Sequence, residues 1–133
     1  ERLTRTLADG STLVLNPASA VDIVFNAEAR LILLRHGEIF IETAKDPRPL
    51  IVRSAQGEME ALGTRFSVRQ QDGVTQLTVF QHAVAVRPEG APGEQTIIDS
   101  GQTVSLKAST LFDRPRLATL ADTRVSERLV VDG

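Results

Sequence analysis

Short runs of alternating polar and apolar residues, separated by turns that contain glycine, recur along this chain. The alternation has the two-residue period of a strand that buries one of its faces. Asp72-Gly73 is typical of a tight hairpin turn, and turns about every 8–12 residues are typical of all-β proteins. Helical periodicity is weak before Ser109. The glycine turns are Asp9-Gly10, His36-Gly37, Gln56-Gly57, Asp72-Gly73 and Ser100-Gly101.

We therefore predict an all-β fold built from many short strands. Strands joined in this way can wind into a β-roll or solenoid-like arrangement, or pair into a sandwich, and the pattern leaves these alternatives open. The two prolines at 47 and 49 predict a rigid connector. The predicted strands are residues 12–15, 21–25, 30–34, 38–43, 50–53, 58–62, 64–68, 74–80, 84–87, 95–98 and 102–107.

The predicted domain organisation has two parts. Residues 1–108 form the all-β domain, and residues 109–133 are interpreted as a linker. The linker ends in a lead-in strand at 128–131, whose partners we expect beyond Gly133 in a short C-terminal domain. Because the chain starts at Glu1 without an initiator methionine, we expect it to be part of a longer protein.

Composition narrows the possible function classes. The net charge is −2, with both signs interspersed, and the aromatic residues are five Phe without Trp or Tyr, which argues against a nucleic-acid surface. The absence of cysteine excludes disulfides, thiolate metal sites and a cysteine nucleophile. Only two histidines are present, so no metal or cofactor is predicted. No run reaches the roughly 18 apolar residues of a membrane span, and no signal peptide is present.

Residues 61–68, with the sequence ALGTRFSV, combine a clear strand with an awkward glycine. From Thr64 onward, Thr64, Phe66 and Val68 share one face of the predicted strand. Gly63 interrupts the pattern, because glycine weakens a strand and usually marks a bulge or a close backbone approach. We therefore expect a bulge at Gly63, with Thr64 packed inward.

An ordered set of motifs over residues 3–107 resembles the periplasmic domain of FecR-type sigma-factor regulators. The set begins with Leu7-Ala8-Asp9-Gly10-Ser11, and its longest piece is residues 61–68. Leu50 and His82 depart from it, since the family usually has Phe and Gly at these positions. The other matching residues are Leu15-Asn16, Ser19, Arg30, Ile32, Leu34, Gly37-Glu38, Phe40, Asp46, Arg48-Pro49, Leu77-Thr78-Val79, Val84-Ala85-Val86 and Gly101-Gln102.

The resemblance implies a regulatory interaction module rather than an enzyme. The parent protein would be a single-span inner-membrane protein, and this chain its periplasmic part. A cytoplasmic segment outside this chain would bind an extracytoplasmic-function (ECF) sigma factor. The region beyond Gly133 would contact the N-terminal signalling domain of an outer-membrane TonB-dependent transducer occupied by an iron–siderophore. Candidate interaction residues in this chain are Arg65, on the outer face of its strand, and Leu129, Val130 and Val131 near the C-terminus.

Self-cleavage between Gly63 and Thr64 is the alternative that the resemblance adds, because some members of the family are cut at this bond. The Thr64 hydroxyl would attack the Gly63 carbonyl carbon and displace the Thr64 nitrogen as a free amine, in an N→O acyl shift, and water would then cleave the resulting ester. The reaction needs a strained peptide, a base and an oxyanion donor. His82, in the adjacent hairpin, is the one candidate base.

The remaining polar residues have simpler interpretations. His36 and His82 adjoin turns and are expected to be solvated. Two carboxylate pairs, Glu38 with Glu42 and Glu58 with Glu60, each share a strand face and are expected to be exposed charges that discourage edge pairing. For Glu38 we also expect hydrogen bonds to backbone groups of the adjacent turn. A carbohydrate-binding β-module is a third alternative, although such modules usually display Trp or Tyr for stacking.

Overall fold

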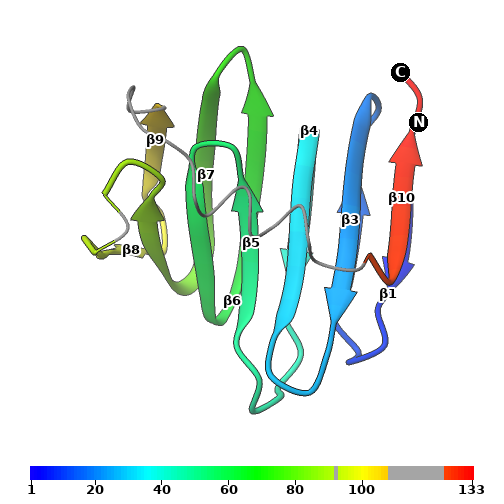
Figure 1. Ribbon diagram of the computed structural model, residues 1–133, viewed down its shortest axis with the longest axis horizontal. Coiled ribbons are helices and arrows are strands. Elements are labelled where there is room, and N and C mark those ends of the chain that lie inside the picture. Colours follow the sequence, from blue (N-terminus) through cyan, green and yellow to red (C-terminus); the bar gives the residue numbers. More distant parts are fainter. Residues whose placement is uncertain (92, 108–124) are drawn as a thin grey trace.

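The computed structural model describes residues 1–91, 93–107 and 125–133, and the regular elements in these ranges are all strands (Figure 1). Ten strands are joined by hydrogen bonds into one mixed sheet, which confirms the all-β prediction. They are β1 (Leu3–Thr6), β2 (Thr12–Leu15), β3 (Ser19–Phe25), β4 (Arg30–Glu42), β5 (Leu50–Ser54), β6 (Gly57–Gln71), β7 (Val74–Pro88), β8 (Thr96–Asp99), β9 (Thr103–Lys107) and β10 (Glu127–Val131).

Three of the strands are long, which the sequence did not predict. β4 has 13 residues, and β6 and β7 have 15 each. The turns expected at His36-Gly37 and at Gln81-His82 are bends inside β4 and β7, because the chain keeps its direction there and only changes neighbours. β1 was not predicted either, and it pairs with β2 at the edge of the sheet.

The long strands change pairing partners halfway along, so the sheet forms two layers. In layer 1 the strand order is β1-β2-β4-β6-β7-β9, made by the C-terminal halves of β4 and β6 and the N-terminal half of β7. In layer 2 the order is β10-β3-β4-β5-β6-β7-β8, made by the other halves of the same strands. β5 joins the two parts of layer 2, running parallel to β4 and antiparallel to β6.

One hydrophobic core fills the space between the layers. Layer 1 contributes side chains such as Ile41, Phe66 and Leu77, and layer 2 contributes Ile32 and Met59, all completely buried. Complete burial of side chains on both halves requires that the inner faces pack against each other. The arrangement is therefore a rolled sandwich, and it combines the two alternatives that the sequence left open.

Residues with positive φ mark the places where strands pass from one layer to the other. Gly37 in β4 has φ +91°, Gly63 in β6 has φ +65°, and His82 in β7 has φ +62°. At each bend the inward alternation shifts by one residue, so that in β4 the inward positions change from Ile32 and Leu34 to Ile39 and Ile41. Each strand can therefore keep its apolar side chains inside while it changes layer.

The C-terminal strand belongs to this sheet. β10 pairs with β3 over Glu127–Val131, and Leu129 enters the core with 5% exposure. β10 thus has a partner, β3, inside this domain, which the prediction for 128–131 did not include. The ion pair between Arg5 and Glu127, with 2.5 Å between Nη1 and Oε2, ties β10 to β1 in the other layer. The rest of the predicted linker, up to residue 124, lies outside the described residues.

Candidate functional site

The Gly63-Thr64 peptide sits in a bulge at the bend of β6, as predicted. Leu62 pairs with Ala83 and Arg65 pairs with Gln81, so Gly63 and Thr64 together oppose His82. A β-carbon added at Gly63 would meet nothing within 4 Å, and therefore the positive φ, not lack of space, is the reason for glycine here. His82 occupies a position where the resembled family usually has glycine, and its φ of +62° explains that preference.

Thr64 is held by hydrogen bonds on both sides. Its backbone N–H donates to Thr43 Oγ1 at 2.9 Å, and the Thr43 N–H donates to the Thr64 carbonyl at 3.1 Å. Its hydroxyl donates to the Gln81 carbonyl, and the residue is only 3% exposed. His82 is exposed, and its side chain forms no hydrogen bond within the part of the chain that the structure describes. Thr64 therefore packs inward, and cleavage at this peptide stays a prediction.

The four candidate interaction residues are placed differently. Arg65 is exposed on layer 1, and its guanidinium lies 5.7 Å from the centre of the Phe40 ring. Val130 is 52% exposed on the outer face of β10, while Val131 is half-buried. Leu129 is part of the core, so within this domain it has no surface for a partner.

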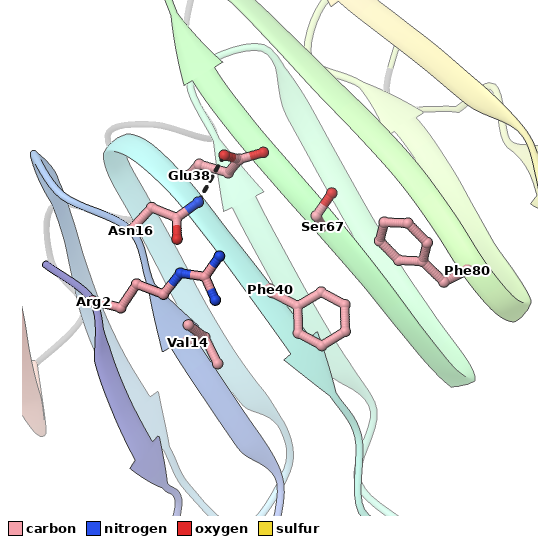
Figure 2. A pocket seen from close by; sticks show the side chains of 7 residues that line it. All are labelled: Arg2, Val14, Asn16, Glu38, Phe40, Ser67 and Phe80. Carbon is pink, nitrogen blue, oxygen red and sulfur yellow. Dashed lines mark hydrogen bonds between the residues drawn. The ribbon is translucent and has the colours of Figure 1, made fainter.

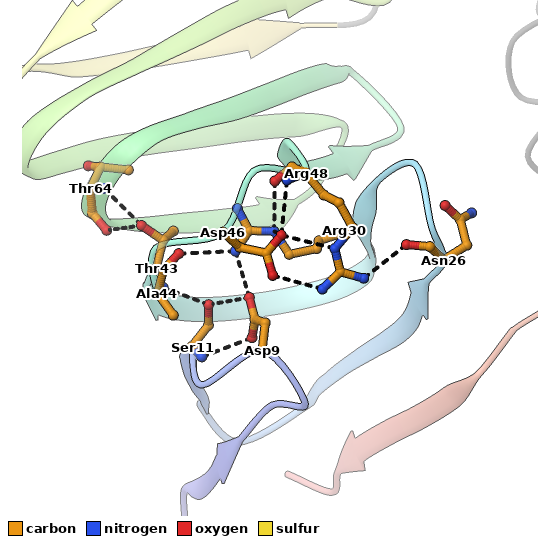
Figure 3. Close-up of polar contacts among 9 residues, drawn as sticks. All are labelled: Asp9, Ser11, Asn26, Arg30, Thr43, Ala44, Asp46, Arg48 and Thr64. Atoms are coloured by element: carbon orange, nitrogen blue, oxygen red, sulfur yellow. Dashed lines mark hydrogen bonds and ion pairs between the residues drawn. The ribbon is translucent and has the colours of Figure 1, made fainter.

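A polar cluster that the sequence reasoning missed joins the first turn to the crossover between β4 and β5 (Figure 3). Arg30 donates from Nη1 to Asp9 Oδ2 at 2.6 Å and from Nε to the Arg48 carbonyl at 2.9 Å. Arg48 in turn donates from Nη2 to Asp46 Oδ2 at 2.8 Å. The Ser11 hydroxyl donates to Asp9 at 2.7 Å and accepts from the Ala44 N–H at 2.8 Å.

All the charged members of this polar cluster belong to the motif set found in the sequence. Their contacts with one another explain why these residue types occur together in the motifs. The Asp9 side chain is fully buried and the Arg30 side chain is 6% exposed, so each neutralises a charge that would otherwise be buried alone. Burial raises the pKa of Asp9, but hydrogen bonds from Arg30 and Ser11 outweigh burial and hold this pKa below its usual value. Hydrogen bonds from Arg48 hold the pKa of Asp46 far below its usual value. No periodicity signals such a cluster, but the recurrence of Asp and Arg in the motif set could have indicated it.

A second fully buried acid fixes β10. Asp22 accepts from Arg35 Nε at 2.8 Å and from Arg128 Nε at 2.5 Å. Burial raises the pKa of Asp22, but the hydrogen bonds from Arg128 and Arg35 outweigh burial and hold this pKa below its usual value. The carboxylate therefore stays charged. Asp22 therefore links β10 and β4 through side chains on the outside of β3.

The carboxylate pairs are not simply solvated charges. Glu58 is 4% exposed and pairs with Arg53 and Arg87, contrary to our expectation of an exposed residue. Glu60 pairs with Arg87 at 3.0 Å. Glu38 Oε1 accepts from the Asn16 side chain at 2.8 Å rather than from the backbone of the turn.

An exposed groove of about 350 Å³ crosses the outer face of layer 1 (Figure 2). Phe40 from β4 and Phe80 from β7 meet over the small Ser67, with ring centres 5.6 Å apart. Phe80 is 51% exposed, so this aromatic pair is partly in water. The other residues along the groove are Arg2, Val14, Asn16 and Glu38. Sequence reasoning missed the pair, because the two phenylalanines are 40 residues apart and meet only through β6.

Within residues 1–91, 93–107 and 125–133, no group of three or more His, Asp or Glu side chains is arranged to hold a metal ion. In the same ranges, no helix has the length and apolar character needed to cross a bilayer. His36 is exposed, and its Nδ1 lies 2.9 Å from the Ala18 carbonyl.

This chain is similar in fold to solved structures and matches one family profile. Two crystal structures of a putative anti-sigma factor from Parabacteroides distasonis ATCC 8503, at 1.65 and 2.50 Å resolution, match with a TM-score of 0.69 and 22% sequence identity. The match covers 99% of this chain and 57% or 56% of that protein, so this chain spans little more than half of its length. The comparison with curated proteins gave no match. The family profile described as FecR protein matches residues 1–85, and the chain therefore belongs to the FecR protein family.

Proposed function

We propose that this chain is the periplasmic signal-transmitting domain of a membrane-anchored sigma-factor regulator. It relays the occupancy of an outer-membrane TonB-dependent transducer by an iron–siderophore to a cytoplasmic ECF sigma factor. The domain works by binding and transmission and is not an enzyme. The observation that carries this proposal is the FecR family match over residues 1–85.

Two further observations support a role in sigma-factor regulation. The fold is similar, over 99% of this chain, to a protein described as a putative anti-sigma factor. The acidic and basic groups with the deepest burial, such as Asp9 with Arg30, form ion pairs with each other, which is typical of structural rather than catalytic groups. The described residues thus offer rigidity and exposed surfaces, as a relay domain requires.

The position of β10 indicates how a signal could enter the domain. β10 is an edge strand held by β3, by Asp22 and by the ion pair of Glu127 with Arg5. A load or a partner acting on the chain after Val131 would therefore act on β3 and on the core directly. Val130, with 52% exposure, is the candidate contact at this edge.

Binding of the transducer's purified signalling domain tests the proposal. We expect the protein extended past Gly133 to bind it, and residues 1–133 alone to bind weakly or not at all. Biolayer interferometry with both proteins immobilised at equal density measures the difference. Failure of the extended protein to bind, with the signalling domain folded by circular dichroism, would contradict the transducer part of the proposal. Equal binding by both proteins would mean that residues 1–133 themselves recognise the signalling domain.

Self-processing at Gly63-Thr64 is the second candidate function. It is favoured by the positive φ of Gly63, which sets the peptide in a bulge, and by the hydroxyl of the next residue. The buried Thr64 hydroxyl, which donates to the Gln81 carbonyl, argues for a structural role instead. The mass of the purified protein distinguishes the two roles, since cleavage gives two fragments and a structural role leaves one intact chain.

A further inference from the structure

The outer face of layer 1 is a broad, open β-surface. Six strands contribute to it, and a row of uncharged residues runs across its middle. Phe40 belongs to this row, and Phe80 lies beside the row on β7 with 51% exposure. In register order the row is Thr4, Val14, Phe40, Ser67, Thr78 and Thr103.

Charges of opposite sign stand on the two central strands of this face. On β4, Glu38 and Glu42 lie on either side of Phe40. Their register partners on β6 are Arg69 for Glu38 and Arg65 for Glu42. Within the described residues, neither of these register pairs forms an ion pair. Arg65 lies over the Phe40 ring, Arg69 donates to Gln76 at 3.2 Å, and Glu38 accepts from Asn16. The face therefore presents an acidic column beside a basic column.

We propose that this face is the contact surface of a homodimer, with a second copy of the chain as its occupant. A two-fold axis parallel to the strands, between β4 and β6, would place β4 of each copy over β6 of the other. The axis preserves the level along the strands, so Glu42 would face Arg65 of the second copy and Glu38 would face Arg69. The columns are thus complementary to themselves, as a two-fold interface requires.

The same rotation matches the uncharged residues. Phe40 would lie over Ser67 of the second copy, and β7 with Phe80 would lie over β2, where Val14 lines the groove. Two twisted sheets pack face to face with their strands within about 30° of each other. Long arginine and glutamate side chains can span the offset that this angle leaves. The aromatic pair would then be covered, with charges around it, which is the usual arrangement of an interface.

The size of the face predicts a weak dimer. Six strands and five residues along each give roughly 29 by 17 Å. The area buried on both copies together is then at the lower end of specific interfaces, roughly 1,000 Å². We therefore expect reversible association at micromolar to near-millimolar concentrations.

Sedimentation velocity on the 133-residue protein and on charge variants tests the proposal. In a dimer of Glu42→Arg, the new arginine of each copy faces Arg65 of the other copy, so the repulsion occurs twice. In a dimer of Arg65→Glu, the new glutamate of each copy likewise faces Glu42 of the other copy. Each variant alone should weaken dimerisation by at least about tenfold, because both copies carry the repulsion. An equimolar mixture of the two variants should form heterodimers, since each arginine again faces a glutamate.

A matched control lies on the other layer, where Leu62 is 45% exposed. Leu62→Glu should leave the dimer unchanged, whereas Phe80→Glu should abolish it. Circular dichroism checks that every variant is folded. A protein that stays monomeric at the highest concentration would overturn the proposal. So would a mixture of Glu42→Arg and Arg65→Glu that does not associate, or a wild-type dimer that Leu62→Glu disrupts and Phe80→Glu does not.

Discussion

Gly37→Ala tests the claim that the sheet forms two layers by bending at positions of positive φ. The φ of Gly37 is +91°, and a β-carbon added at Gly37 would lie 2.2 Å from Ser19 Oγ and 2.5 Å from Ser19 Cα. Rotation of a side chain cannot relieve an overlap with backbone. Movement of Ser19 would also break its hydrogen bond from the Glu38 N–H, which is 2.9 Å long.

The expected loss for Gly37→Ala has two parts. The left-handed conformation costs a non-glycine residue about 1–2 kcal/mol, and the overlap with Ser19 adds to it. We expect a total of at least about 4 kcal/mol, which is exceptional for one substitution. Since domains of this kind have about 5–15 kcal/mol of stability, the variant should be close to unfolding.

Gly63→Ala is the matched comparison. Gly63 has φ +65° but nothing within 4 Å of an added β-carbon, so we expect only the conformational cost, about 1–2 kcal/mol. Urea denaturation followed by far-ultraviolet circular dichroism measures both variants, since the chain has no Trp or Tyr. The claim is that the backbone is crowded at the Gly37 bend and not at the Gly63 bend. An equal loss of unfolding free energy in the two variants would refute it.

Three further predictions concern the polar residues. Arg30→Met leaves the buried Asp9 carboxylate without its main partner and should cost about 3–5 kcal/mol by urea denaturation; a cost under 1 kcal/mol would contradict the role of the polar cluster. The pKa of Asp22 is lowered in the folded state, so its stabilisation is present above about pH 4 and is lost as the pH falls through that lowered pKa. Asp22→Asn should therefore reduce the acid sensitivity of unfolding, and an unchanged pH profile would argue against this link. Purified wild-type protein should give one intact mass, because the Thr64 hydroxyl donates to the Gln81 carbonyl; two masses that Thr64→Ala reduces to one would establish self-processing instead.

The local strand pattern was predictable, while the bends were not. Alternation identified most strands because each buries one face, as in Thr64, Phe66 and Val68. The same glycine signal stands for two different structures, however. Asp72-Gly73 reverses the chain between β6 and β7, and His36-Gly37 only bends β4. Local sequence does not distinguish them, because the neighbours of Gly37, such as Ser19, come from elsewhere in the chain.

The candidate surfaces depended on contacts between distant residues. The bulge at Gly63 was predicted from one residue, but Thr43, which binds Thr64, was not. The pairing of β10 with β3 was not predicted, because five residues cannot show that they match a strand about a hundred residues earlier. The Phe40–Phe80 pair and the polar cluster of Asp9 and Arg30 exist only once the sheet has formed.

The proposed relay is tested most directly by transcription from a promoter of the partner sigma factor, in cells that make the full-length regulator. With the transducer present, its iron–siderophore should change the reporter signal. A regulator that lacks residues 1–133 but keeps its other segments in the membrane, at equal abundance by immunoblot, should lose that response while it still binds the sigma factor. A ligand response of unchanged size without residues 1–133 would contradict the account.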